Sequence, residues 1–149
     1  MVALTATGYS GTPLPKKLGL KDGQRVLFVG LPDVLGALAD SCQFLAVDRE
    51  GSLSGLALGD TRYDVVHAFT ASRGELAGGM DTLQDAIVPD GMIWVSWPKK
   101  AAKIETDVTE DVVRAEALAR DLVDVKVCAV DAVWSGLKLV IRKEKRHLH

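Results

Sequence analysis

The chain has 149 residues, a length at which one hydrophobic core and one domain are expected. Hydrophobic residues make up 48% of the sequence and charged residues 26%, so the composition excludes a disordered chain. The 18 Lys plus Arg residues and 20 Asp plus Glu residues give a net charge of -2, which argues against a global basic field and a nucleic-acid partner.

The first third of the chain predicts a short helix and two strands. Residues 1–24 form a loop and one short helix, which Thr12 can cap and Gly19 can end. Residues 25–30, R-V-L-F-V-G, form an apolar run that is typical of a strand buried on both faces of a parallel sheet. A short helix over 33–40 and a second strand over 44–47 follow; this strand ends at Asp48.

The middle of the chain predicts two more strands around one helix. Residues 49–61 are rich in Gly and Ser and indicate no clear element, and residues 65–69 form a third buried strand. Ser72 and Glu75 form a capping box, S-x-x-E, at the start of a helix whose inner face carries Leu76, Met80, Leu83 and Ile87. A fourth strand over 92–97 ends at Pro98, because proline has no N–H to donate.

The last third predicts one helix and a hairpin. Thr109 caps a helix that runs to near Asp124, with Val112, Ala115, Ala119 and Leu122 on its inner face. Two β-runs over 125–133 and 137–142 indicate an antiparallel hairpin that turns at Trp134-Ser135-Gly136, and residues 143–149 form a charged tail.

Alternation of strands and helices predicts an α/β, Rossmann-like three-layer sandwich over residues 1–149, treated as a single domain. The sheet is mostly parallel, helices cover both faces, and the C-terminal hairpin adds an antiparallel strand at one edge. No apolar run approaches the roughly 20 residues of a membrane span, and no signal peptide is recognisable, so we expect a cytoplasmic protein without a membrane partner. Cys42 and Cys128 have no Cys or His at ligand spacing, so we expect two reduced, structural thiols and no metal site.

Two stretches resemble the class I methyltransferases. Residues 63–70, Y-D-V-V-H-A-F-T, look like the fourth strand of that fold, and residues 88–98, V-P-D-G-M-I-W-V-S-W-P, look like its fifth strand, while the terminal hairpin resembles its last two strands. This resemblance implies a shortened version of that fold. The sequence departs from it after the first strand, where residues 30–36 read G-L-P-D-V-L-G instead of a G-x-G-x-G loop, and a separate third strand is missing before Tyr63.

Three shorter motifs resemble an uncharacterised bacterial domain family. They are Y-S-G-T-P-L at residues 9–14, S-W-P-K-K at residues 96–100 and W-S-G-L-K at residues 134–138, so this resemblance spans nearly the whole chain. It implies a family without implying an activity.

Candidate ligand-binding residues follow the predicted strands, because ligands of open α/β sheets bind outside the carboxyl ends of the strands. Asp48 stands where a ribose-binding acid is expected, with a surface Asp as the alternative. The indole and two ammonium groups of W-P-K-K suit an anionic or planar ligand, with a core Trp and solvated lysines as the alternative. The full candidate set is Gly30, Asp48, Thr70, Trp97, Lys99 and Lys100.

Nothing in the sequence marks a catalytic residue. His67 lies inside an apolar strand and is better read as a hydrogen-bonded core histidine than as a general base, and Ser72 is explained as a helix cap. Because the glycine loop is missing, we expect a binding or regulatory module that is not an enzyme and uses no cofactor. It would take a small anionic or planar ligand or a protein partner. The alternatives are a small-molecule enzyme that uses S-adenosylmethionine or a nucleotide, and an assembly subunit that forms homo-oligomers through the terminal hairpin.

Overall fold

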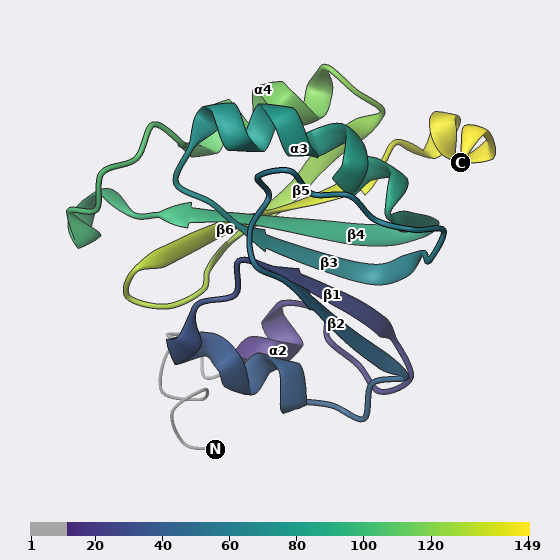
Figure 1. The fold of residues 1–149 in the computed structure, drawn as a ribbon, viewed down its shortest axis with the longest axis horizontal. Helices are drawn as coiled ribbons and strands as arrows, with labels where there is room; N and C mark the ends of the chain where they lie inside the picture. The colour runs from purple at the N-terminus through teal and green to yellow at the C-terminus, as the bar shows by residue number, and fades with distance from the viewer. Residues whose placement is uncertain (1–11) are drawn as a thin grey trace.

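A six-stranded sheet organises the protein, and its strands follow the order β2-β1-β3-β4-β6-β5 (Figure 1). The computed structural model describes residues 12–149; residues 1–11, with the start of the first motif, lie outside it. The strands β1 to β4 pair in parallel, while β6 runs antiparallel between β4 and β5, so β5 points in the same direction as the first four. The strands are β1 (Arg25–Val29), β2 (Ala46–Glu50), β3 (Tyr63–Phe69), β4 (Ile87–Pro98), β5 (Leu122–Ala129) and β6 (Trp134–Ile141).

Helices cover both faces of the sheet, which confirms the expected α/β class. The helices α3 (Arg73–Asp85) and α4 (Glu110–Leu118) lie on one face (Figure 1). The opposite face carries α2 (Leu14–Lys17) and the 3-10 helix η1 (Asp33–Asp40). Two further 3-10 helices are η2 (Lys100–Ala102) and η3 (Lys143–Leu148). The antiparallel strand β6 is one position in from the edge, and β5 forms the edge itself.

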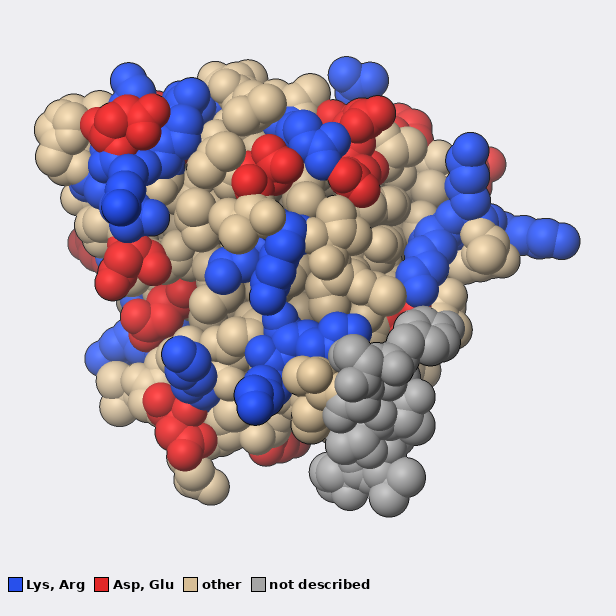
Figure 2. Space-filling view, turned by 180° about the vertical axis from the view of Figure 1, so that it is seen from behind, with Lys and Arg blue, Asp and Glu red and all other residues tan. Residues whose placement is uncertain are grey.

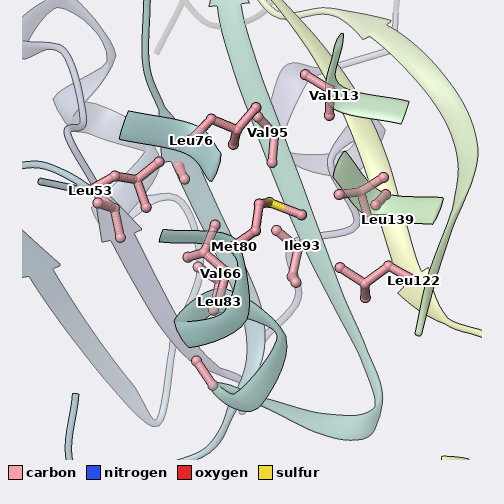
Figure 3. Packing of buried hydrophobic residues seen from close by; sticks show 14 of the residues in the cluster. Leu53, Val66, Leu76, Met80, Leu83, Ile93, Val95, Val113, Leu122 and Leu139 are labelled. Atoms are coloured by element: carbon pink, nitrogen blue, oxygen red, sulfur yellow. The ribbon is translucent and has the colours of Figure 1, made fainter. Parts of the chain in front are cut away.

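The larger core lies between the sheet and α3. This helix begins as the sequence predicts, because the Ser72 Oγ accepts a hydrogen bond from the Glu75 N–H at 3.1 Å. Its apolar residues then recur on one side and meet the side chains of β3 and β4 (Figure 3). The buried residues at this contact include Val66, Leu76, Met80, Leu83, Ile93 and Val95.

The second core lies under α2 and η1. Leu14 and Leu18 are buried there, as their spacing of four predicts. The Trp94 Nε1–H donates to the Leu18 carbonyl at 2.9 Å, so the indole of β4 ties the N-terminal helix to the sheet. Leu35 and Leu38 of η1 complete this layer.

His67 lies at the centre of this second core, as expected for a core histidine. It is 1% exposed, stacks on Phe69 with ring centroids 4.2 Å apart, and its Nε2 lies 2.7 Å from the Ser96 Oγ. Burial lowers the pKa of His67 to about 3, so the ring is neutral at pH 7. Gly136 on β6 leaves room for this pair, because a Cβ there would lie 2.9 Å from the Ser96 Oγ.

Three sequence predictions differ from the structure in the α2, α4 and hairpin regions. The cap of α2 is Pro13, which has no side-chain hydrogen bond, instead of Thr12. The helix α4 ends at Leu118, and its buried residues are Val113 and Ala117 instead of Val112 and Ala115. The sequence left this choice open, because the adjacent valines at 112 and 113 each fit an apolar face of the same helix. The hairpin turns at Asp131, earlier than expected.

Asp131 forms the hairpin turn that the sequence placed at Trp134-Ser135-Gly136. Its Oδ1 accepts hydrogen bonds from the N–H groups of Val133 and Trp134 at 2.8 and 2.7 Å. Trp134 and Gly136 therefore belong to β6. The signal was present in the sequence, because an Asp side chain commonly accepts hydrogen bonds from the backbone two and three residues later.

The C-terminal segment folds back on the molecule instead of remaining a solvated tail. The His149 Nε2 lies 2.9 Å from the Asp121 Oδ2, and the Arg146 Nε donates to the Ile141 carbonyl at 3.1 Å.

Among residues 12–149, no helix has the length and apolar character needed to cross a membrane.

Two neighbouring glycines of α3 provide a matched stability test. A Cβ on Gly79 would lie 2.9 Å from the Leu53 Cδ2, whereas a Cβ on Gly78 would meet nothing within 4 Å. We expect Gly78→Ala to stabilise the protein by about 0.5–1 kcal/mol, because alanine favours the helix. Gly79→Ala should lose that gain through overpacking and destabilise by about 1 kcal/mol, as measured by urea unfolding. Equal effects of both substitutions would contradict this packing.

The buried His67 predicts a loss of stability in acid. Its folded pKa of about 3 lies below the unfolded value of about 6.5, so the unfolded state binds the extra proton as pH falls. The contribution is complete above pH 6.5 and is lost toward pH 3, at up to about 1.4 kcal/mol per pH unit. Urea unfolding between pH 7 and 4.5 should show a shallower pH slope for His67→Leu combined with Ser96→Ala. The control His149→Gln should retain the part of the pH slope that comes from His67.

Candidate functional site

The chain reverses its direction across the sheet between β1 and β3, where open α/β sheets bind ligands. Gly30 follows β1 at this point, has φ 69°, and donates its N–H to the Glu50 carbonyl at 2.8 Å. A Cβ on Gly30 would lie 2.9 Å from the Phe69 carbonyl oxygen. Glycine is therefore required here by both backbone conformation and close packing, and the backbones of β1 and β3 meet directly.

A shallow hollow of about 210 Å³ lies beside this contact, at the carboxyl ends of β1 and β2. Its lining residues are Gly30, Leu31, Arg49, Glu50 and Gly51. Glu50 is the last residue of β2 and is exposed, and a Cβ on Gly51 would meet nothing within 4 Å. The hollow thus combines an open backbone segment with a carboxylate at a strand end.

Glu50, and not Asp48, occupies the strand-end position that the sequence assigned to the ribose-binding acid. The strand begins two residues later than predicted and runs to Glu50, so Asp48 lies in its middle. The Asp48 Oδ2 accepts a hydrogen bond from the Tyr63 hydroxyl at 2.6 Å. Burial, together with this hydrogen bond, raises the pKa of Tyr63 to about 12. Asp48 therefore has a structural partner away from the hollow.

Thr70 follows β3 at the same edge but is only 4% exposed. Its hydroxyl donates to the Glu75 Oε1 at 2.8 Å and accepts from the Ser72 N–H at 3.2 Å, so it supports the start of α3. A second hollow of about 340 Å³ opens next to it and is lined by Ala71, Ser72, Glu105, Thr106 and Asp107. The Thr106 hydroxyl donates to the Ala71 carbonyl at 2.8 Å, which holds the two sides of this hollow together.

The structure separates the side chains of the W-P-K-K turn, Trp97, Lys99 and Lys100, instead of joining them in one surface. Trp97 is 7% exposed and packs in the core under α3, so its indole offers little surface to a ligand. The Lys99 Nζ donates to the Asp131 carbonyl at 2.6 Å, while Lys100 is exposed in η2. The two lysines therefore have different surroundings, because Lys99 contacts the turn between β5 and β6 and Lys100 faces solvent.

The structure adds no obvious acid–base or metal centre to these hollows. His67 is enclosed in the core away from them. Burial raises the pKa of the Cys128 thiol, even though the positive charges of Lys17, Lys99 and Lys126 tend to lower this pKa. Lys17 and Lys99 come from other segments of the chain, whereas Lys126 precedes Cys128 by two residues on β5. Among residues 12–149, no three His, Cys, Asp or Glu residues are grouped to hold a metal ion.

Gly30 and Gly55 form a matched pair for testing the edge of the sheet. Both have positive φ, at 69° and 67°, but a Cβ on Gly55 would meet nothing within 4 Å. Gly55→Ala should cost about 1 kcal/mol of backbone strain. Gly30→Ala should cost at least 1 kcal/mol more, because it adds a clash with the Phe69 carbonyl. Equal losses in chemical denaturation would show that the contact between β1 and β3 is loose.

Comparisons with known proteins connect this architecture to one group of enzymes. No protein-family model matches the chain, and no curated protein sequence does, so the motif-based family stays an expectation. Similar solved structures include a SAM-dependent methyltransferase from Geobacter sulfurreducens, with a TM-score of 0.61 and 14% identity over 87% of this chain and 89% of that chain. A SAM-dependent methyltransferase from Thiobacillus denitrificans has a TM-score of 0.60 and 15% identity over the same shares. The CcbJ methyltransferase from Streptomyces caelestis has a TM-score of 0.59 and 13% identity over 90% and 92%.

These similarities correct the expectation that no cofactor is involved. The Geobacter and Thiobacillus proteins are both complexes with S-adenosyl-L-homocysteine, so proteins of this fold bind such a cofactor. The mostly parallel sheet with β6 inserted antiparallel before its edge matches these structures along most of their length. The protein therefore has the Rossmann-like α/β fold of the S-adenosylmethionine-dependent methyltransferases.

Proposed function

We propose that the protein binds S-adenosylmethionine at the carboxyl edge of β1 and β2 and is an enzyme of the methyltransferase type. The observation that supports this most directly is the Glu50 carboxylate beside Gly30, at the end of β2 in a fold shared with S-adenosylmethionine-dependent enzymes. Glu50 replaces Asp48 as the ribose-binding candidate, while Gly30 keeps the role proposed for it from the sequence.

The residues of the hollow fit the nucleoside part of that cofactor. An exposed carboxylate accepts hydrogen bonds from neighbouring hydroxyl groups of a ribose. No ion pair of Glu50 occurs among the salt bridges of residues 12–149, so both of its oxygens can accept. Leu31 adds half-buried apolar surface, and Gly51 leaves the backbone open on the solvent side. The volume of about 210 Å³ suits part of a ligand, since whole drug-sized ligands occupy roughly 300–1,000 Å³.

The contribution of the chain to the reaction would be positioning. When bound, S-adenosylmethionine supplies an electrophilic methyl group. Glu50 would hold the ribose, and the Gly30 turn would set the direction in which the chain leaves β1. The hollow of about 340 Å³ next to Ser72 and Thr106 lies at the end of β3, along the same sheet edge, and is our candidate for the acceptor substrate.

Calorimetric titration with S-adenosylmethionine tests this proposal. Charge-assisted hydrogen bonds contribute about 1.5–3 kcal/mol, so Glu50→Gln should weaken binding by about tenfold or more. Asp48→Asn removes the same charge from the same strand but leaves an acceptor for Tyr63, and it should bind within about twofold of the wild type.

Two results would contradict the proposal. One is the absence of binding to the folded wild type at millimolar S-adenosylmethionine and S-adenosylhomocysteine, which would return the protein to the class of binding modules. The other is an equal loss of affinity in both variants, which would place the ligand away from Glu50.

A further inference from the structure

Five lysines gather on the sheet face that also carries α2. Lys126 of β5 and Lys138 of β6 are directly opposite each other in the antiparallel register. Cys128 lies two residues further along β5, near the positive charges of Lys17, Lys99 and Lys126, and Lys138 lies near those of Lys21 and Lys126. Figure 2 shows basic side chains running through the middle of the rear face, with acidic side chains toward its margins. We call Lys17, Lys21, Lys99, Lys126 and Lys138 the lysine face.

No carboxylate neutralises the lysine face within the described part of the chain. None of its lysines occurs in a salt bridge there. Of the acidic residues near these lysines, Asp22 and Asp131 use their side chains to accept backbone N–H groups, and Asp124 pairs with Arg114. Like charges directly opposite on a sheet are destabilising, so the Lys126–Lys138 pair weakens the hairpin when the face is free. An anion that binds across the pair would remove this repulsion.

The composition of the lysine face indicates which anion it suits. The ion pairs among residues 12–149 use arginine or, at Asp121, also His149, and none uses a lysine. Arginine matches planar carboxylates through two parallel hydrogen bonds, whereas lysine acts as a point charge that suits phosphate oxygens. Lysines alone therefore favour phosphate groups over an acidic protein surface.

Two more observations argue against single-stranded nucleic acid and against a lipid surface as the source of the phosphates. No aromatic residue among residues 12–149 is exposed, so the lysine face lacks the stacking platform on which single strands bind. The strand β5 has two exposed apolar residues, Val125 and Val127, and neither lies between the lysines of this face. Val127 pairs with Leu137 and points to the other face of the sheet, and Val125 is at a bulge. Neither valine therefore offers a lipid surface an apolar side chain to bury between these charges.

We propose that the lysine face binds the phosphate backbone of duplex nucleic acid without sequence specificity. Ammonium groups spread over two strands and the α2 region can each contact one phosphate, and they displace condensed counterions when they do. This inference does not rest on the cofactor proposal. It also revises the expectation drawn from net charge, because a chain of net charge -2 gathers its lysines locally.

Fluorescence anisotropy with a labelled 24-base-pair DNA duplex tests this inference on the full chain. The logarithm of the binding constant should fall with the logarithm of salt concentration with a slope of about -3 to -4.5, as expected when most of the five lysines contact phosphates. Combining Lys126→Gln with Lys138→Gln should weaken binding at least tenfold at low salt and reduce the slope by about 2. Its thermal midpoint should equal or exceed that of the wild type, because a repulsion is removed.

The matched control combines Lys143→Gln with Lys145→Gln, which removes the same charge from η3, and should bind within twofold of the wild type. If the first variant misfolds, Lys17→Gln with Lys21→Gln takes its place. Equal weakening by the control, a slope near zero, stronger binding to the separated single strand, or binding only to vesicles with 30% phosphatidylserine would overturn the inference. Loss of S-adenosylmethionine binding with duplex binding intact would remove the proposed function alone.

Discussion

The burial of β3 on both of its faces is the constraint on which the rest of the architecture depends. Val66 and Ala68 pack under α3, while Val65, His67 and Phe69 pack under the opposite layer. β1 and β4 satisfy its backbone on either side. A strand enclosed in this way reaches solvent only past its end, so the groups that follow Phe69 and its parallel neighbours are the ones free to meet a ligand.

The segment between β2 and β3 explains why the edge of the sheet is so shallow. Residues 51–62 contain no strand or helix, and the structure uses them as a cover in which Leu53 packs against Gly79 of α3. Within residues 12–149, no further strand therefore pairs with the outer side of β2. Glu50 and Gly51 lie at a margin instead of at the floor of a deep cleft, and the carboxylate stays hydrated until a ligand arrives.

Local patterns predicted the parts of the fold in which one segment decides its own structure. The capping pair Ser72 and Glu75 and the apolar period after it predicted α3, and the apolar runs predicted β1 and β3. The edge strand β2 was displaced by two residues because its outer position needs no apolar pattern, and charged residues carry no periodic signal there.

The candidate site was predictable only in outline, because its residues come together through tertiary structure. The sequence placed Gly30 and Thr70 at one edge of the sheet, as the structure does, but the strand-end position of Glu50 depended on the register between β1 and β2. Trp97 read as a ligand platform and is a core residue, since its neighbours across the sheet are invisible in a single segment. The lysine face joins residues from 17 to 138, and no local charge count could have assembled it.

The outer strand β2 has a consequence for the behaviour of the protein at high concentration. An edge strand offers unpaired N–H and C=O groups to any other chain, and long apolar edges promote aggregation. Here the strand has five residues and ends in Asp48-Arg49-Glu50, all exposed. A second strand that approached this edge would have to desolvate three adjacent charges to form its ladder. Glu50, which ends β2 beside the candidate site, therefore also helps to prevent another chain from pairing with this edge.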